Sequence, residues 1–374
     1  MPFGRRRLPL ELSLTYVSEH EFDRIRSGDM TPAIAAQYLQ DERIPLRSFN
    51  DALRNMYPYP DLALRLVETF QGDDASRSVS RKVNNWLSGA SRPTDREDVF
   101  RIAFALDLSE EQANRLLGIC TEYGIHYRNG REAVYAWCLR RDMGYLEARA
   151  LFESLPAVPS SAGSPPEAPH DLTHQIQNLF ALARTVEELR ECYIASLDRF
   201  GAFHLRAYRY FSKYMRSLIR PTSSWEDTPE EQYSLETVMA TYLSLHMPSG
   251  KSRSGYSLTQ KLIKQGWPNA TALKNIMAQR ADVPRKLLLL LYIITENVID
   301  GEYSELDEDY ASLEDRLSDH WWVVNAMLTD CGMPVLDPRN AFDWLVLYSL
   351  AASGDESMSE RMEQVIDKLY EDVK

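Results

Sequence analysis

Helical periodicity runs through almost the whole chain and limits the folds open to it. Apolar residues recur three and four positions apart, the spacing that places side chains on one face of an α-helix. Breaks containing proline, glycine or asparagine separate these stretches, and no stretch alternates with period two convincingly enough to predict a strand. The sequence therefore predicts an all-α fold. The clearest helical stretches are 99–106, 111–119, 131–139, 186–197 and 287–294.

A proline- and serine-rich segment divides the chain into two parts. Residues 156–170 hold five prolines and three serines with few side chains to bury, a composition typical of a linker. We therefore expect an N-terminal domain over about 10–155, a helix-turn-helix unit followed by a helical hairpin, and a C-terminal helical domain over 171–374. A chain of 374 residues is long enough for two or three domains of ordinary size.

The two parts share sequence in matching order, which indicates an internal duplication. Residues 120–139 align with 331–350 at a constant offset of 211. Further upstream, 79–93 parallels 269–284. Matches that recur in the same order are typical of a repeat. The sequence thus predicts two related multi-helical units, each containing a helix-turn-helix-like element, with the second a degenerate copy over about 235–355.

Nothing in the sequence indicates a membrane span, a secretion signal or a metal site. The longest apolar run, 287–294, has eight residues, whereas a membrane-spanning helix needs about 20. The cysteines are widely spaced, without the C-x-x-C or histidine-bearing patterns of disulfide frameworks and zinc sites. We therefore expect a cytoplasmic protein without membrane contact, metal or cofactor, whose cysteines pack as small apolar residues. They are Cys120, Cys138, Cys192 and Cys331.

The motifs of common enzymes are missing too. The sequence lacks glycine-rich phosphate loops, the H-E-x-x-H metalloprotease motif and the G-x-S-x-G nucleophile elbow. Its seven histidines are scattered, and none stands at a persuasive spacing from an acid. His126 and His204 lie among aromatic residues, where a packed histidine is a more frequent outcome than a general base. The sequence predicts a binding protein rather than an enzyme.

Residues 79–108 carry the most informative functional pattern. Val79, Val83, Trp86 and Leu87 fall at positions i, i+4, i+7 and i+8, which places them on one buried face of a helix. A glycine that can adopt the left-handed conformation and then a proline end this helix. The opposite face offers charge for phosphates, and arginine and asparagine groups that pair with guanine and adenine edges. The residues on that face are Arg77, Arg81, Asn84, Asn85 and Ser88.

This pattern resembles the recognition helix of the lambda-repressor-like (XRE-type) helix-turn-helix regulators. The resemblance covers roughly residues 45–140. Upstream of the pattern, the longer segment 71–78 replaces the tight turn that usually joins the two helices of the motif. The residues that match V-x-x-W-L-x-G-x-x-x-P, followed by an apolar helix ending in A-L-x-L-S, are Val83, Trp86, Leu87, Gly89, Pro93 and 105–109.

The resemblance implies that the chain binds double-stranded DNA as a transcriptional regulator. It implies one group of residues that reads bases in the major groove, and a second group that holds phosphates and makes binding salt-sensitive. The residues that would read bases are Arg81, Asn84, Asn85 and Ser88. The residues that would bind phosphates are Arg77, Lys82, Arg92 and Arg96.

The net charge of −13 is unevenly distributed, and this leaves room for DNA binding. Residues 1–155 contain 21 basic and 23 acidic side chains, against 21 and 32 in 156–374, where most of the excess lies beyond Glu296. Between residues 77 and 101, six basic side chains outnumber three acidic ones. The alternative interpretation is that the polar side of this helix is simply the solvated face of a surface helix.

The second unit repeats part of this pattern. Leu273, Ile276 and Met277 take the places expected to be buried, and 251–286 contains eight basic groups against one acidic group. Gln279 stands in the place of the helix-ending glycine. This unit is either a second DNA half-site, which would give one chain a two-fold readout, or a degenerate copy kept for packing. The residues that would contact DNA are Thr271, Lys274, Asn275, Arg280, Arg285 and Lys286.

A basic stripe is predicted on a helix within 199–220. Its cations recur three and four residues apart beside a stripe of apolar and aromatic residues. This arrangement suits a nucleic-acid backbone, and it suits equally well docking against the acidic segment 300–319 or an ordinary solvated helix face. The basic stripe consists of Arg206, Arg209, Lys213, Arg216 and Arg220.

Three functions follow from these patterns. Sequence-specific binding of double-stranded DNA is the leading one. A protein-interaction adaptor or inhibitor that reuses a helix-turn-helix scaffold is the alternative, because the net charge is acidic and the second motif is altered. RNA binding through the basic stripe ranks last, because the chain lacks the signatures of common RNA-binding modules. The expected partner is DNA, with a protein partner and a second copy of the chain as further candidates.

Overall fold

A computed structural model describes residues 16–71, 76–121, 123–158, 172–201, 205–220, 232–250, 255–295, 313–352 and 356–371. Every regular element in these ranges is helical, with nineteen α-helices and one short π-helix. The predicted all-α class is confirmed. Each of the five helical stretches expected from the sequence coincides with a helix to within three residues at either end, because the same buried apolar face defines the pattern and the helix.

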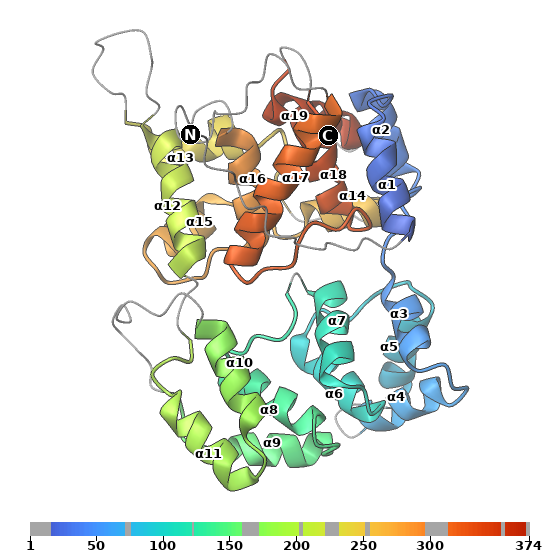
Figure 1. The fold of residues 1–374 in the computed structure, drawn as a ribbon. Coiled ribbons are helices and arrows are strands. Elements are labelled where there is room, and N and C mark those ends of the chain that lie inside the picture. Colours follow the sequence, from blue (N-terminus) through green and yellow to red (C-terminus); the bar gives the residue numbers. More distant parts are fainter. Residues whose placement is uncertain are drawn as a thin grey trace, which may run out of the picture.

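The helices form two lobes, drawn one above the other in Figure 1. The lower lobe contains α3 (Phe49–Met56), α4 (Leu62–Phe70), α5 (Ser76–Leu87), α6 (Arg96–Ala105), α7 (Glu110–Cys120), α8 (Gly130–Leu139), α9 (Tyr145–Glu153), α10 (Leu172–Leu182) and α11 (Val186–Ala195). The upper lobe contains α1 (Tyr16–Arg26), α2 (Pro32–Gln40), α12 (Leu205–Ile219), α13 (Leu235–Val238), η1 (Met239–Leu243), α14 (Leu258–Lys264), α15 (Ala270–Met277), α16 (Arg285–Thr295), α17 (Leu313–Asp330), α18 (Ala341–Leu350) and α19 (Met358–Leu369).

Each lobe has its own apolar core. The first core runs from Phe49 to Phe200, and the second joins residues 25–44 to residues 207–370. The cores therefore divide the chain differently from the predicted boundaries of 10–155 and 171–374. Of the predicted linker, only its first three residues fall within the described part of the chain.

The first two helices pack on the second core, although they precede the first unit in the sequence. Leu39 of α2 is fully buried, and the ring of Tyr38 stacks on that of Trp344 in α18, with 5.5 Å between centroids. The hydroxyl of Tyr348 donates a hydrogen bond to the carbonyl oxygen of Met30 at 2.9 Å. The second core, chiefly α19, covers the apolar face of α2, which is why the N-terminal helices pack away from the lobe that follows them in the sequence.

Helices α10 and α11 follow the predicted linker in the sequence, yet they pack on the first core and complete it. Ile176, Phe180 and Leu189 are fully buried there. The indole Nε1 of Trp137 in α8 donates to the carbonyl oxygen of Ala183 at 2.9 Å, between α10 and α11. A buried indole N–H needs such an acceptor, so this bond helps to fix the α10–α11 hairpin on α8.

Side-chain caps define where many of these helices begin. Ser109, Thr185, Ser257 and Ser357 each form a capping box, in which the cap side chain and the third helical residue exchange hydrogen bonds with the backbone. These bonds satisfy amide groups that would otherwise lack partners at a helix start. The sequence thus sets the helix starts locally, while the apolar faces set the packing.

The described residues carry little that points to a membrane or a metal. Among them, no helix combines the length and apolar character that a membrane span requires. Nor do they bring three potential metal-ligating side chains together. The four cysteines are free thiols, and burial raises the pKa of Cys120 and Cys331 to about 12.

Candidate nucleic-acid interface

Helix α5 has the buried face that its sequence predicts. Val79, Val83 and Trp86 are 2%, 0% and 3% exposed, while Leu87, expected beside them, is only half-buried. The indole of Trp86 meets the ring of Phe70 from α4 edge to face, at 5.4 Å. This packing holds α5 against α4, and it determines which side of α5 faces solvent.

The opposite side of α5 carries the predicted base-reading residues. Arg81, Asn84, Asn85 and Ser88 are all exposed. The Ser88 hydroxyl donates to the carbonyl oxygen of Asn85, one turn back, at 3.2 Å. Within the described part of the chain, the side chains of Arg81, Asn84 and Asn85 have no hydrogen-bond or ion-pair partner. One guanidinium and two amides therefore stand together on one helix face with their bonding groups open.

Lys82 does not belong to this open face. Its Nζ lies 2.8 Å from Oδ2 of Asp98 on α6, and 5.0 and 4.9 Å from the ring centroids of Phe70 and Trp86. The lysine thus joins α5 to α6 through an ion pair and cation–π contacts. Its side chain is still 41% exposed, so the predicted phosphate contact of Lys82 stays a prediction.

Arg96 is an internal residue rather than a phosphate ligand. Its guanidinium forms a two-bond pair with Glu132, with Nε–Oε1 at 2.8 Å and Nη2–Oε2 at 2.6 Å. Its two terminal nitrogens also donate to the carbonyl oxygens of Tyr123 at 3.1 Å and Gly124 at 2.6 Å. All three guanidinium nitrogens are used inside the lobe, because a buried carboxylate at Glu132 requires a cation beside it.

Of the other two residues predicted to bind phosphates, Arg92 forms hydrogen bonds within the protein. Its Nη1 donates to the carbonyl oxygen of Ile119 at 3.0 Å, and its Nη2 donates to Oε1 of Gln265 in the upper lobe at 3.4 Å. This arginine therefore connects the lobes. The side chain of Arg77 lies outside the described residues, so its predicted role stays a prediction.

One cation near α5 was missed by sequence reasoning. Arg54 of α3 is exposed, and its Nη2 donates to the carbonyl oxygen of Leu87, at the end of α5, at 3.3 Å. It belongs to another helix, and its position in the sequence carries no signal that it reaches α5. Arg54 places a positive charge beside the open face where the predicted phosphate ligands are engaged elsewhere.

The candidate contacts of the second unit are only partly open. Thr271, Lys274 and Arg280 are exposed, whereas Asn275 is half-buried. Lys274 forms an ion pair with Glu236 of α13, with 2.6 Å between Nζ and Oε1. An acid thus stands beside the open face of α15, in contrast to α5.

Arg285 and Lys286 are buried and bind inside the upper lobe, which corrects their predicted DNA contacts. Arg285 forms a two-bond pair with Asp343, at 2.6 and 2.9 Å, and donates to the carbonyl oxygens of Pro334 and Val335. Lys286 is 3% exposed, and its Nζ donates to three carbonyl oxygens at the C-terminal end of α14. A lysine there satisfies carbonyl groups that the helix itself leaves without donors.

Arg96 in the lower lobe and Arg285 in the upper lobe form matching networks of hydrogen bonds. Arg96 binds Glu132 and the carbonyls of residues 123 and 124, and Arg285 binds Asp343 and the carbonyls of residues 334 and 335. Asn114 Oδ1 accepts from the amide of Ile125 at 2.7 Å, and Asn325 Oδ1 accepts from that of Leu336, also at 2.7 Å. Each of these acceptors and loop residues in the upper lobe follows its lower-lobe counterpart by 211 positions.

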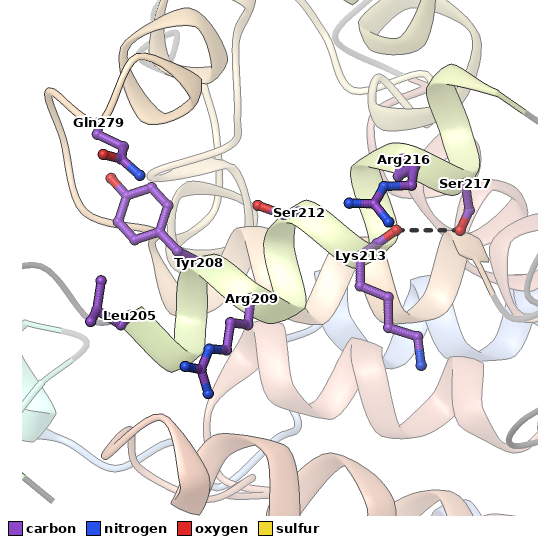
Figure 2. Close-up of a pocket in the computed structure, with 8 residues that line it drawn as sticks. All are labelled: Leu205, Tyr208, Arg209, Ser212, Lys213, Arg216, Ser217 and Gln279. Carbon is purple, nitrogen blue, oxygen red and sulfur yellow. Dashed lines mark hydrogen bonds between the residues drawn. The ribbon is translucent and has the colours of Figure 1, made fainter. Parts of the chain in front are cut away.

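The basic stripe lies on α12. Arg209, Arg216 and Arg220 are exposed, and Lys213 is half-buried. Arg206 forms an ion pair with Asp330 of α17, which leaves it outside the open part of the stripe. Figure 2 shows Arg209 and Lys213 extending from the same side of α12, along a hollow of about 630 Å³.

Comparisons with known proteins leave the motif as the sole indication of family. No family model, curated protein or solved structure matches this chain. The resemblance to helix-turn-helix regulators therefore rests on the residues of α5 and its neighbours. Most of the open hydrogen-bonding groups of the candidate interface lie on the exposed face of α5.

Proposed function

We propose that this chain is a sequence-specific DNA-binding protein, a cytoplasmic transcriptional regulator whose α5 enters the major groove of the double helix. The observation that carries the proposal is the open face of α5. Arg81, Asn84 and Asn85 present unpaired donors and acceptors to solvent, while the opposite side of the helix is locked into the first core. Arginine makes paired hydrogen bonds to guanine, and asparagine does so to adenine.

The packing of α5 supports this role, because a reading helix has to be held rigidly. Trp86 and Val83 fix the helix against α4, and Lys82 fixes it against α6 through Asp98. The backbone of such a helix is already fixed before binding, so less free energy is lost in ordering the interface.

The contacts that the predicted phosphate-binding residues make within the protein change the expected salt dependence of DNA binding. Lys82, Arg92 and Arg96 already have partners within the protein, so that among the described side chains Arg54 is the cation that flanks the reading face without an acidic partner. Each phosphate contact contributes about 0.9 to the slope of log affinity against log salt. We therefore propose a shallower salt dependence than four phosphate contacts on this segment would produce.

We also propose that the chain arose by internal duplication, with α5–α9 corresponding to α15–α19. The matched networks of Arg96 and Arg285 support this, as do the matched loop bonds of Asn114 and Asn325. Hydrogen-bond partners that recur at one offset are hard to produce by chance helical packing. In this proposal the second unit is the degenerate copy, because Lys274 is already paired on its reading helix.

An electrophoretic shift experiment with genomic fragments tests the DNA proposal. At about 50 mM salt we expect the full chain to bind duplexes, and we expect the affinity to fall as salt is raised. The double variant Arg81→Ala/Asn85→Ala should lose preference for the best fragment, with a difference of about 1–3 kcal/mol for each paired contact removed.

A matched control keeps this experiment interpretable. Arg115 is an exposed arginine on α7 that pairs with Glu111, away from the reading face of α5. Arg115→Ala removes the same charge and should leave the preference unchanged. Absence of duplex binding by the folded wild-type chain at about 50 mM salt would overturn the proposal.

A further inference from the structure

A groove runs along α12 and past the end of α15 in the upper lobe. Two hollows of about 630 and 280 Å³ share the side chains of Tyr208, Ser212, Arg216 and Gln279, so they form one continuous depression. Figure 2 shows the residues that line the larger hollow. Its lining extends from Leu205 to Arg220, which corresponds to about 22 Å of helix at 1.5 Å per residue. A depression of this length suits an elongated ligand better than a compact one.

The charge along the groove has one sign. Arg209, Arg216 and Arg220 are exposed, and within the described part of the chain no ion pair neutralises them. Lys213 lines the groove as well, and none of the described residues that line it is acidic. Because the outer arginines lie eleven residues apart, the positive charge extends over about 16 Å. The occupant should therefore carry several negative charges along its length.

The open floor of the groove is aliphatic. Met277 was expected to be buried, yet it is 45% exposed and lines the groove beside Ile276 and Ile219. Its counterpart at the end of α5, Leu87, is half-buried. Methionine packs against ligands of varied shape because its side chain is flexible and polarisable. The occupant should thus bring apolar side chains as well as charge.

These features favour a protein segment over a nucleic acid. Grooves that bind single-stranded nucleic acids stack the bases on exposed aromatic rings. The rings that line this groove, Tyr208 and Phe211, are 7% and 2% exposed, and the hydroxyl of Tyr208 is bonded to the carbonyl oxygen of Ala281. The described residues of the groove therefore offer a ligand aliphatic contacts and arginines, without exposed rings on which bases stack.

We propose that the groove between α12 and α15 binds an acidic amphipathic helix of a protein partner. The apolar side chains of such a helix, spaced three and four residues apart, would cover Met277 and Ile219, and acids on its flank would pair with Arg209, Arg216 and Arg220. The groove lies in the upper lobe, whereas α5 lies in the lower lobe (Figure 1). The two proposals concern different surfaces and can be tested separately.

A designed peptide provides the test. The probe is a fluorescein-labelled helix of about 18 residues, with leucines on one face and glutamates on both flanks. Fluorescence anisotropy should show saturable, salt-sensitive binding to the full chain. Arg209→Glu/Arg216→Glu should weaken binding about tenfold or more, and Met277→Asp should weaken it as well. A peptide with lysines in place of the glutamates should prefer the charge-reversed variant to the wild type.

The controls separate this proposal from its rivals. Arg115→Glu/Arg149→Glu makes the same charge change on the exposed helices α7 and α9, and binding of the glutamate peptide should stay within about twofold of wild type. Circular dichroism establishes that each variant is folded. Equal binding by wild type and Arg209→Glu/Arg216→Glu, or no saturable binding by either, would overturn the proposal. The proposal would also be overturned if a thymidine oligonucleotide of about 20 nucleotides displaced the peptide from the wild type and failed to bind Arg209→Glu/Arg216→Glu.

Discussion

Two arginines with internal partners, Arg96 and Arg285, show how residue type alone misleads about function. Each begins a helix and belongs to a cluster of basic residues, and the sequence therefore assigns both to DNA contacts. In the structure each forms a two-bond pair with a buried carboxylate and also binds loop carbonyls. The sequence provides no sign of the partner, because Glu132 lies 36 positions away and Asp343 lies 58 positions away.

Removal of one member of such a pair should cost more than removal of both. We expect Arg96→Ala to lower the free energy of unfolding by about 3–5 kcal/mol, because Glu132 would be left charged and buried. Arg96→Met/Glu132→Leu should recover most of that loss, since no uncompensated charge remains. Urea unfolding of the full chain measures both. If the double variant is as unstable as the single one, the loss does not come from the stranded carboxylate.

His320 should make the protein sensitive to mild acid. Burial, and then the charge of Arg316, lower the pKa of His320 to about 4, whereas an unfolded histidine titrates near 6.5. The unfolded chain then binds the proton first, so stability is complete above about pH 6.5 and is lost as the pH falls toward 4. The loss from this one residue is about 3 kcal/mol at most.

The variant His320→Gln tests this prediction. Its amide oxygen can still accept from the hydroxyl of Tyr292, which lies 2.7 Å from Nδ1 of His320, but the residue no longer titrates. Urea unfolding between about pH 6.5 and 4.5 should therefore show a flatter decline for the variant than for wild type. Identical slopes for the two proteins would show that His320 does not cause the acid sensitivity.

Among the candidate contacts, exposure could be predicted for some residues and not for others. Arg81, Asn84 and Asn85 follow from the period of their own helix, because Val79, Val83 and Trp86 fix which side is buried. The partners of Lys82, Arg92 and Arg285 lie on other elements, and no local pattern reveals them. Local periodicity thus determines the face of a residue, while tertiary packing determines whether its charge is free.

At the scale of elements, α5 and α15 end in the same way with different residues. Gly89 has φ +78° after α5, and Gln279 has φ +52° after α15. In each case the left-handed residue donates its amide to the carbonyl three residues back, at 3.3 Å for Gly89 and 2.9 Å for Gln279. Glycine adopts this conformation without strain, whereas glutamine does so at a cost.

Substitution of Gly89 and of Gln279 should change the free energy of unfolding in opposite directions. Gly89→Ala should lower the free energy of unfolding by about 1 kcal/mol, although a Cβ there would meet Asn50 only at an ordinary 3.6 Å. Gln279→Gly should raise the free energy of unfolding by up to about 1 kcal/mol. Gly118→Ala, inside α7 with open space around it, is the control and should also be stabilising. Destabilisation by Gln279→Gly would mean that its side-chain contacts outweigh the backbone strain.

The helices themselves were predictable, and the end of α15 shows where periodicity stops being sufficient. Ile276 and Leu273 are buried as expected, but Met277 is 45% exposed beside the groove along α12. Met277 lies at the edge of the apolar face of α15, where a side chain is buried only if a neighbouring element covers it. Whether such an element exists depends on how α12 packs, which the pattern within α15 does not contain.

At the scale of the whole molecule, the chain crosses between the lobes more than once. α1 and α2 belong to the second core, α3 to α11 to the first, and α12 onward to the second again (Figure 1). A proline-rich segment suggested a single boundary near 156–170, because composition reports where a chain has little to bury. Composition carries no information on which distant surface covers the apolar face of α2.

Two leucines close in sequence should therefore affect different lobes. Leu39 and Leu53 are both fully buried, the first in the second core and the second in the first core. We expect each leucine-to-alanine change to cost about 2–5 kcal/mol. Hydrogen exchange should accelerate most in α18 and α19 for Leu39→Ala, and most in α6 to α8 for Leu53→Ala. Faster exchange in α6 to α8 alone for Leu39→Ala would contradict this assignment of the cores.

The most direct measurement of the function is enrichment of sequences from a pool of random DNA duplexes. The wild-type full chain should enrich one defined sequence, because Arg81, Asn84 and Asn85 present open bonding groups to base edges. Arg81→Ala/Asn85→Ala should recover duplexes without that preference, while Arg115→Ala should enrich the wild-type sequence. Enrichment of the same sequence by wild type and the double variant, or of none by wild type, would contradict a reading role for α5.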